Sequence, residues 1–193
     1  MAHTSVETMA KHLISELRQV RPSGPYYLMG YSFGGIVAYE MAQQLTAARE
    51  EVPLLALLDT YAPGLYATAR EQEKKFYEPL KSAVFRWLIS RKLRAGERVP
   101  VRLRNFHIID TYDRAALAYA AKPYAGRLTM MKAIGSWGAD EMGWSALAKG
   151  GLDVVRVPGD HYSMISEPQV ARVATYLDER MLALEAERAI ARS

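Results

Sequence analysis

The sequence predicts an α/β fold in which a mostly parallel sheet carries helices on both faces. Short apolar runs bounded by turn residues alternate with segments of helical periodicity, which is the pattern of strand–helix–strand units. The run Val52–Asp59 is almost continuously apolar, as is typical of a strand buried on both faces of a parallel sheet. With 193 residues, 50% of them hydrophobic, the chain is long enough for one domain with a substantial core.

The stretch Tyr26–Gly35 is the centre of this arrangement. It combines a brief apolar strand, a Gly-x-Ser-x-Gly turn, and the start of a helix that we expect to reach about Ala47. This pattern predicts a nucleophile elbow, which exposes a serine, here Ser32, on a sharp turn. We expect side chains at Gly30 and Gly34 to collide with neighbouring backbone. The alternative is an ordinary glycine turn between a strand and a helix.

The other predicted elements lie on either side of the elbow. A capping box with Thr4 as N-cap and Glu7 three residues later indicates a helix before it. Arg127–Ile134 and Leu152–Val157 predict two further strands, and a final amphipathic helix is expected to begin near Pro168. Functional loops should lie at the carboxyl ends of the strands.

A long, mostly helical stretch follows the strand at Val52–Asp59. It runs from about Arg70 to Ala121, far longer than an ordinary connection between strands. We expect one domain over residues 1–193 with an insertion over about 65–121. Residues 74–104 hold ten Lys or Arg against two Glu, so the chain's net charge of +4 is concentrated there. Because no nucleic-acid-binding module accompanies this charge, nucleic acid is not an expected partner.

The composition excludes several classes of protein. No apolar run approaches 18 residues, so no membrane partner is expected. The first residues lack the basic start and apolar core of a signal peptide. The absence of cysteine excludes disulfides, thiol catalysis and cysteine-ligated zinc, and it fits a cytoplasmic location. We expect neither a metal nor a cofactor.

A catalytic serine needs a histidine that takes its proton and an acid that orients the histidine. In α/β enzymes with this elbow the chain order is serine, acid, histidine. Only His107 and His161 follow Ser32. His107 lies in the middle of a predicted helix of the insertion. His161 follows a predicted strand end and a Pro-Gly turn, so we predict His161 as the base.

The position of the acid is open between two residues. Asp59 ends the strand that follows the elbow helix, at the same sheet edge as Ser32. Asp140 follows the next strand and lies in a polar loop. Its place in the chain resembles the usual position of the acid in α/β-hydrolases. Position alone favours neither residue. Asp160 is adjacent to His161 and would have to fold back on its neighbour, so we exclude it.

With these residues assembled, the chain resembles the C-terminal thioesterase domain of nonribosomal peptide and polyketide synthetases, in the α/β-hydrolase superfamily. The resemblance covers nearly the whole chain and is weakest in the insertion. The matching stretches are Gly24–Ala42, Leu57–Gly64, Pro123–Leu128 and Pro158–Met164. Family members of this type take their acid from the position of Asp59, so the resemblance implies a triad of Ser32, Asp59 and His161. It also implies that the insertion is a mobile helical lid over the acyl pocket.

The resemblance implies a mechanism and a partner. An acyl or peptidyl chain arrives as a thioester on the phosphopantetheine arm of a carrier protein, and Ser32 attacks it to give an acyl-enzyme. Water or a nucleophile within the chain then releases the product. The backbone N–H of Phe33, the residue after the nucleophile, is the expected oxyanion donor. The basic insertion could dock the acidic carrier and its phosphate, or it could be a solvated helical face.

The chain also departs from the family pattern. Complete α/β-hydrolases have several strands before the helix that precedes the elbow, and this chain opens inside that helix. A glycine-rich loop that supplies the second oxyanion N–H belongs to the missing segment, so we expect a fragment, or an internal start at Met1, with weak or no activity alone. Rival interpretations are a stand-alone editing thioesterase with a later acid, a generic carboxylesterase, and an inactive carrier-binding remnant.

Overall fold

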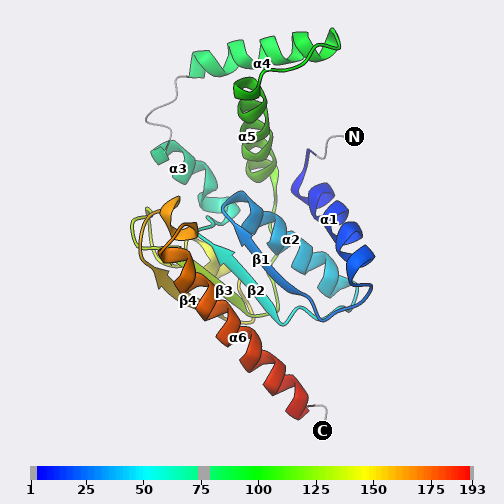
Figure 1. Ribbon diagram of the computed structural model, residues 1–193, viewed down its shortest axis with the longest axis vertical. Coiled ribbons are helices and arrows are strands. Elements are labelled where there is room, and N and C mark those ends of the chain that lie inside the picture. The colour runs from blue at the N-terminus through cyan, green and yellow to red at the C-terminus, as the bar shows by residue number, and fades with distance from the viewer. Residues whose placement is uncertain (1–3, 74–78, 192–193) are drawn as a thin grey trace.

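The computed structural model, which describes residues 4–73 and 79–191, contains a parallel four-stranded sheet (Figure 1). The strands lie side by side in the order of the sequence. They are β1 (Tyr27–Tyr31), β2 (Leu54–Leu58), β3 (Leu128–Ala133) and β4 (Leu152–Val157). All three neighbouring pairs are parallel, so the carboxyl ends of the four strands meet at one edge. The predicted strands and their direction are confirmed.

Helices cover both faces of the sheet. The helices within the described residues are α1 (Val6–Val20), α2 (Phe33–Ala47), α3 (Pro63–Glu73), α4 (Pro79–Arg94), α5 (Val101–Ala118) and α6 (Gln169–Ala191). Short 3-10 turns lie at η2 (Trp144–Ala146) and η3 (Ser163–Ile165). Helices α1 and α2 pack on one face and α6 on the other (Figure 1). None of the helices in the described ranges is long and apolar enough to cross a membrane.

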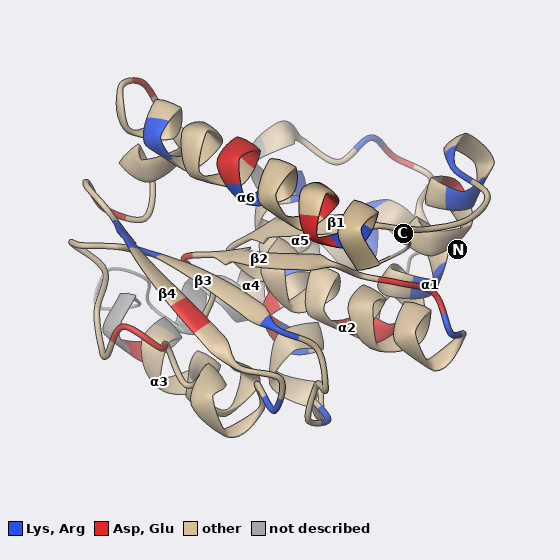
Figure 2. Ribbon diagram, turned by 90° about the horizontal axis from the view of Figure 1, so that it is seen from below, with Lys and Arg blue, Asp and Glu red and all other residues tan. Residues whose placement is uncertain are grey.

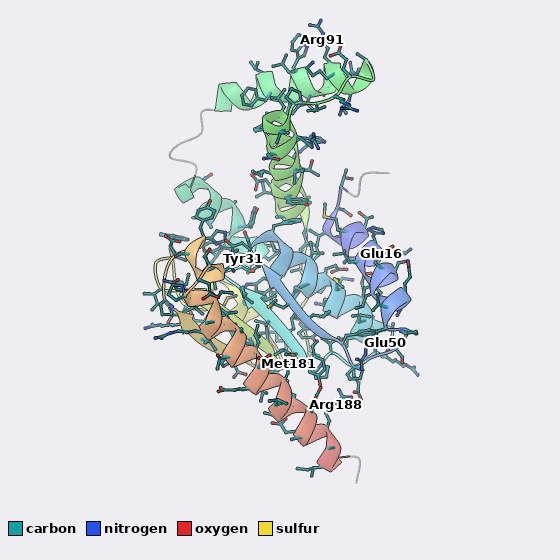
Figure 3. All side chains as sticks on the ribbon, viewed as in Figure 1. Glu16, Tyr31, Glu50, Arg91, Met181 and Arg188 are labelled. Carbon is teal, nitrogen blue, oxygen red and sulfur yellow. The ribbon has the colours of Figure 1, made fainter. Side chains whose placement is uncertain are left out.

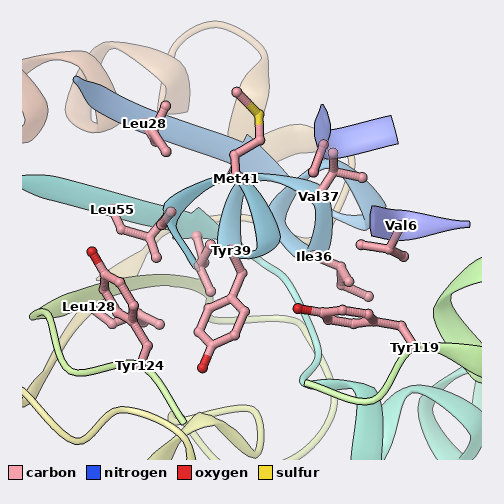
Figure 4. Packing of buried hydrophobic residues seen from close by; sticks show 14 of the residues in the cluster. Val6, Leu28, Ile36, Val37, Tyr39, Met41, Leu55, Tyr119, Tyr124 and Leu128 are labelled. Carbon is pink, nitrogen blue, oxygen red and sulfur yellow. The ribbon is translucent and has the colours of Figure 1, made fainter. Parts of the chain in front are cut away.

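Strand β2 is buried on both faces, as its apolar sequence predicts. Leu55 and Leu57 join the core under α2, where Tyr39, Tyr124 and other large side chains pack (Figure 4). The alternate residues of β2 face the second core, which α6 closes. Strands β1 and β2 carry no charged residue, whereas Lys132 lies in β3 and charges are frequent on the helices (Figure 2). The uncharged strands β1 and β2 lead directly into the turns that carry Ser32 and Asp59.

Two details of the helices differ from the sequence prediction. The N-cap of α1 is Ser5, not Thr4, and Thr8 completes the capping box in place of Glu7. With Ser5 as the N-cap, the fully buried Val6 is the first residue of the helix. It then lies on the same helix face as the buried residues Ala10 and Ile14. In α6, the predicted amphipathic helix, Leu182 is 66% exposed whereas Leu184 is buried, because only Leu184 lies on the helix face that packs on the second core.

The predicted insertion consists of α3, α4 and α5, which lie between β2 and β3 in the chain. Helix α5 joins the insertion to the core through buried residues at its end, including Ala115 and Ala116. Helix α4 lies across the far end of α5, away from the sheet (Figure 1), and Phe85 packs edge-on against Phe106 there. Residues 74–78, with part of the predicted basic cluster, lie outside the described residues.

Candidate active site

Ser32 lies at the turn between β1 and α2. Its backbone has φ 53° and ψ −127°, a conformation that residues other than glycine rarely adopt. The Ser32 N–H donates to the carbonyl of Leu58 at 2.9 Å, which fastens the turn to the end of β2. The Ser32 side chain makes no capping hydrogen bond to α2. This strained backbone is what the elbow motif predicts, and such strain is concentrated at functional sites.

The glycines of the elbow permit close backbone contacts, although not at both predicted positions. A Cβ at Gly30 would lie 2.2 Å from the carbonyl oxygen of Gly34, so the first glycine is required as predicted. A Cβ at Gly34 would meet no atom within 4 Å among the described residues beyond its own neighbours and helix, so that prediction was wrong. Gly34 is exposed at the start of α2. The second tight position is Gly35, whose Cβ would lie 2.1 Å from Thr60 Oγ1.

Asp59 and His161 meet at the carboxyl edge of the sheet. Asp59 Oδ2 lies 2.7 Å from His161 Nδ1, and the Asp59 side chain is fully buried while that of His161 is 21% exposed. Asp59 has a positive φ of 45°, which turns the chain sharply after β2. The backbone N–H of Ala133 and the hydroxyl of Ser136 also donate to its carboxylate, at 3.0 Å and 2.5 Å.

Tyr31, the residue before Ser32, holds His161 beside the elbow. The two rings stack with centroids 4.7 Å apart and an interplanar angle of 27°. The Tyr31 hydroxyl also donates to the backbone carbonyl of His161 at 2.6 Å. Figure 3 labels Tyr31 at the end of β1, next to the loop that follows β4. The last residue of β1 therefore brings the histidine to the nucleophile turn.

The loop that carries His161 is folded around Asp160. The Asp160 carboxylate accepts the N–H of Tyr162 at 3.0 Å and the N–H and hydroxyl of Ser163, both at 2.9 Å. The hydrogen bonds from Ser163 hold the pKa of Asp160 below its ordinary value. This carboxylate is engaged in the turn, which agrees with its exclusion as the acid that orients His161.

The structure does not bring the other two candidates to this site. Asp140 accepts hydrogen bonds from Arg156, with Nε at 2.8 Å, and lies 3.9 Å from Lys132 Nζ. The bond to Asp140 raises the pKa of Arg156 above its ordinary value. His107 lies within α5, as expected from the sequence, and its carbonyl accepts the Thr111 hydroxyl at 2.8 Å.

Phe33 is the first residue of α2, so its N–H is one of those that lack an intrahelical acceptor. The positive end of the helix dipole lies at the same point. The Phe33 ring stacks on Tyr112 of α5, with centroids 4.4 Å apart and planes within 8°. This contact joins the elbow to the insertion.

A cavity of about 780 Å³ opens beside Ser32. Most of its lining is apolar and comes from α1, β1, α2 and α5; it includes Leu13, Met29, Val37, Met41 and Tyr112. Within the two described ranges no cluster of three His, Asp or Glu side chains could hold a metal ion. The surroundings of Ser32 suit an apolar group.

The sequence reasoning missed the residues that support Asp59 and His161. Tyr31 was within the elbow motif but received no role, and Ser136 and Lys132 were not singled out. Ser136 is a small polar residue shortly after the end of a strand, and such residues often contact the end of a neighbouring strand. This pattern only weakly predicts the contact of Ser136 with Asp59. Pairing such residues requires the sheet order, which the local sequence does not contain.

Comparison with known proteins identifies the family. The profile of the family described as Thioesterase domain matches residues 1–180. The chain belongs to this thioesterase family. It is similar to malpinin synthetase of Mortierella alpina, with 29% identity over 185 residues that cover 92% of this chain and 2% of the synthetase. The chain therefore spans only a small part of that curated relative.

Two solved structures show the same relationship for this thioesterase-family chain. One is a covalent complex of the NocB thioesterase domain with a fluorophosphonate nocardicin G analogue (TM-score 0.68, 27% identity, 93% of this chain and 76% of that chain). The other is holo-AB3403, a four-domain nonribosomal peptide synthetase bound to AMP and glycine (TM-score 0.70, 26% identity, 92% and 16%). The expected resemblance and the α/β-hydrolase fold are confirmed, and the chain is a thioesterase domain of the nonribosomal peptide synthetase type.

Proposed function

We propose that Ser32, His161 and Asp59 form a catalytic triad that releases an acyl, polyketide or peptidyl chain from a carrier-protein thioester. The observation that carries this proposal is the 2.7 Å contact between Asp59 Oδ2 and His161 Nδ1, at the sheet edge where the strained Ser32 turn lies. An acid bonded to Nδ1 leaves Nε2 of the imidazole to take the serine proton.

The proposed reaction has two steps through one acyl-enzyme. His161 Nε2 takes the Ser32 proton as Oγ attacks the thioester carbonyl, and the oxyanion forms near the Phe33 N–H. Collapse breaks the carbon–sulfur bond, and the sulfur leaves with the proton from His161 as the phosphopantetheine thiol. Water, or a hydroxyl or amine of the bound chain, then attacks the ester with His161 as base. The products are a free acid or a macrocycle, with Ser32 regenerated.

The surroundings of Ser32 support a substrate with a large acyl part. The cavity of about 780 Å³ beside Ser32 is mostly apolar, and Tyr112 of α5 forms part of its wall. We infer that residues 65–121 act as the lid of a single domain over residues 1–193, because α5 reaches the elbow through the stack of Tyr112 on Phe33. No cofactor enters this reaction, since the phosphopantetheine belongs to the carrier.

The basic residues of α4 are the candidate docking surface for the carrier protein, although two of them are paired inside the insertion. Arg86 contacts Asp110 at 2.9 Å and Lys92 contacts Glu97 at 2.8 Å. Arg91 lies over the ring of Trp87, far from Tyr31 and the elbow (Figure 3). Charge reversal of Arg91 tests this surface: weaker carrier binding supports docking, and unchanged binding supports a solvated face.

Labelling with a fluorophosphonate tests the nucleophile. We expect the full chain to gain one phosphonyl group on Ser32, located by peptide mass spectrometry, and Ser32→Ala to gain none. A folded chain that is not labelled would instead be an inactive remnant. Comparison of an acyl-carrier thioester with a free ester of the same acyl group separates a thioesterase from a carboxylesterase, because only the first prefers the carrier substrate.

The rate of the isolated chain tests the oxyanion site. Phe33 provides one expected donor, and removal of one such donor in a well-studied protease lowers kcat by about 10²–10³. The rate of thioester hydrolysis by the chain of residues 1–193 therefore tests how many donors act: a slow rate would indicate the Phe33 N–H alone, and the rate of a complete hydrolase would show that a second donor takes part.

A further inference from the structure

The Asp59 carboxylate contacts three groups, two from the end of β3 and the loop after it and one from the loop after β4. Oδ1 accepts the Ala133 N–H at 3.0 Å. Oδ2 lies 2.7 Å from His161 Nδ1 and accepts the Ser136 hydroxyl at 2.5 Å. The backbone donor acts on the oxygen that faces away from the histidine, whereas Ser136 acts on the oxygen that faces it. Ser136 therefore has a direct influence on the geometry of the Asp59–His161 pair.

We propose that Ser136 is a positioning residue for the triad, whose hydroxyl fixes the Asp59 oxygen that binds His161. The inference rests on the proposed function, in which Asp59 orients His161. Hydrogen bonds to a carboxylate are short and stronger than those between neutral groups. A hydroxyl donor carries no charge, so it orients Asp59 without neutralising the anion that stabilises the imidazolium.

The loop after β3 places the Ser136 hydroxyl by several independent contacts. The Ser136 N–H donates to Ala133 O at 3.0 Å, and the Gly135 N–H donates to Gly159 O at 2.8 Å. A Cβ at Gly135 would lie 3.1 Å from the same Gly159 carbonyl, so the approach of the two loops is close. The loops that carry Ser136 and His161 are thus bound to each other next to Asp59.

A buried lysine completes the support of Ser136. Lys132 is only 5% exposed, and its Nζ donates to the Ser136 carbonyl at 2.8 Å. The carboxylate of Asp140 lies 3.9 Å from this ammonium group and is held in turn by Arg156. A buried ammonium group requires such partners. Asp140, the other candidate for the triad acid, therefore contributes indirectly by balancing the lysine that holds Ser136.

Because Ser136 acts through Asp59 and His161, its loss should change reactivity more than substrate binding. In Ser136→Ala the Asp59 Oδ2 loses one of its two partners, and the carboxylate gains freedom to rotate. We expect the maximal rate of Ser32 phosphonylation to fall about tenfold, the size that loss of one charge-assisted hydrogen bond gives. The reagent concentration at half-maximal rate should stay within about twofold of wild type, as for an interaction made only in the transition state.

Three variants of the full chain test the proposal. Ser136→Thr keeps a hydroxyl and should recover most of the rate. Ser145→Ala removes an exposed serine in η2 and is the matched control, with no expected change. Lys132→Met removes the support of the Ser136 carbonyl but leaves the hydroxyl, so we expect a smaller loss of rate. If Ser136→Ala does not fold by circular dichroism, Lys132→Met and Ser136→Thr decide the question.

Proton NMR provides a readout that a merely structural role would not change. The proton between His161 Nδ1 and Asp59 should give a low-field resonance, which shifts in folded Ser136→Ala and returns in Ser136→Thr. An unshifted resonance with wild-type phosphonylation would overturn the proposal. If wild-type Ser32 is not labelled at all, the proposed function fails, yet the resonance still shows whether Ser136 positions Asp59. The two failures are therefore distinguishable.

Discussion

Asp59 and Asp140 follow neighbouring strands of one sheet, yet their surroundings differ in charge. Asp59, after β2, is fully buried and receives hydrogen bonds from neutral donors and from His161. Asp140, after β3, is 31% exposed at its side chain and faces the cations Arg156 and Lys132. A carboxylate paired with cations has its charge balanced. A carboxylate held by neutral donors retains a negative charge that can act on a histidine.

The comparison shows that position at the sheet edge does not by itself bring a carboxylate into contact with His161. Both residues lie where functional loops of α/β folds are found. The difference comes from the groups that β3, β4 and the loop after β3 supply: a backbone N–H and a hydroxyl donate to Asp59, whereas a guanidinium donates to Asp140 and an ammonium group lies 3.9 Å from it. The four predictions below test this difference, from the largest expected effect to the smallest.

Replacement of Asp59 or Asp140 by asparagine should give the largest difference between the two sites in the rate of Ser32 phosphonylation. We expect Asp59→Asn to lower the rate of Ser32 phosphonylation by about 10⁴, the loss seen when the triad acid of a serine protease becomes an amide. Asp140→Asn should lower it less than tenfold, and measured inactivation rates check both. A reversed order, with Asp140→Asn inactive, would support the stand-alone editing type of thioesterase.

Asp140→Asn should change stability instead. Lys132 is 5% exposed and would lose the charge of its partner at 3.9 Å, so we expect a loss of about 1–2 kcal/mol in the free energy of unfolding. Urea denaturation measures it. Lys132→Met provides the control, because the amide change should have little effect in that background. An equal loss in both backgrounds would show that Asp140 does not act through Lys132.

Tyr31→Phe tests how Tyr31, rather than Asp59, holds His161 in place. The variant keeps the ring that stacks on His161 but loses the hydroxyl that donates to its carbonyl at 2.6 Å. A neutral hydrogen bond contributes about 1 kcal/mol, so we expect phosphonylation to slow about fivefold. Tyr31→Leu, which also removes the stack, should slow it further. Equal rates for the two variants would mean that the ring contributes nothing to the position of His161.

The smallest effect concerns Asp153, a second carboxylate paired with a cation. Its hydrogen bonds from Arg127, at 2.6 Å, lower the pKa of Asp153 below the ordinary value of 3.8. Because the pKa of Asp153 is lower in the folded chain, the ion pair stabilises the fold at any pH above the ordinary pKa. This contribution is lost as the pH falls through the lowered pKa of the folded state. Because the pair is partly exposed, Asp153→Asn should lower stability by less than about 1 kcal/mol at pH 7.

The pH dependence identifies this contribution. The stability difference between wild type and Asp153→Asn should shrink as the pH falls below about 4, where the carboxyl group of the unfolded chain is protonated. Urea denaturation at neutral pH and near pH 3 provides the comparison. A difference that stays constant or grows on acidification would show that the ion pair is not its source.

The sequence was most informative where the chemistry is local. The elbow, the four strands and the loop that carries His161 follow from apolar runs, turn residues and chain order. Local detail was less certain even there: the tight glycines are Gly30 and Gly35 instead of Gly30 and Gly34, and the N-cap of α1 is Ser5 instead of Thr4. Adjacent residues of the same type fit a local pattern equally well, and packing selects between them.

The sequence by itself predicted the strand–turn–helix unit that carries Ser32, the α/β class and the loop that carries His161, because each depends on a pattern of neighbouring residues. Position alone left Asp59 and Asp140 equal, since each follows a strand at the same edge of the sheet, and the resemblance to the thioesterase family implied Asp59. Only the tertiary structure shows that Asp59 contacts His161, together with Ala133 and Ser136, and these three residues are 74–102 positions away in the chain. Interactions over such separations depend on strand order and loop path, which no local pattern contains.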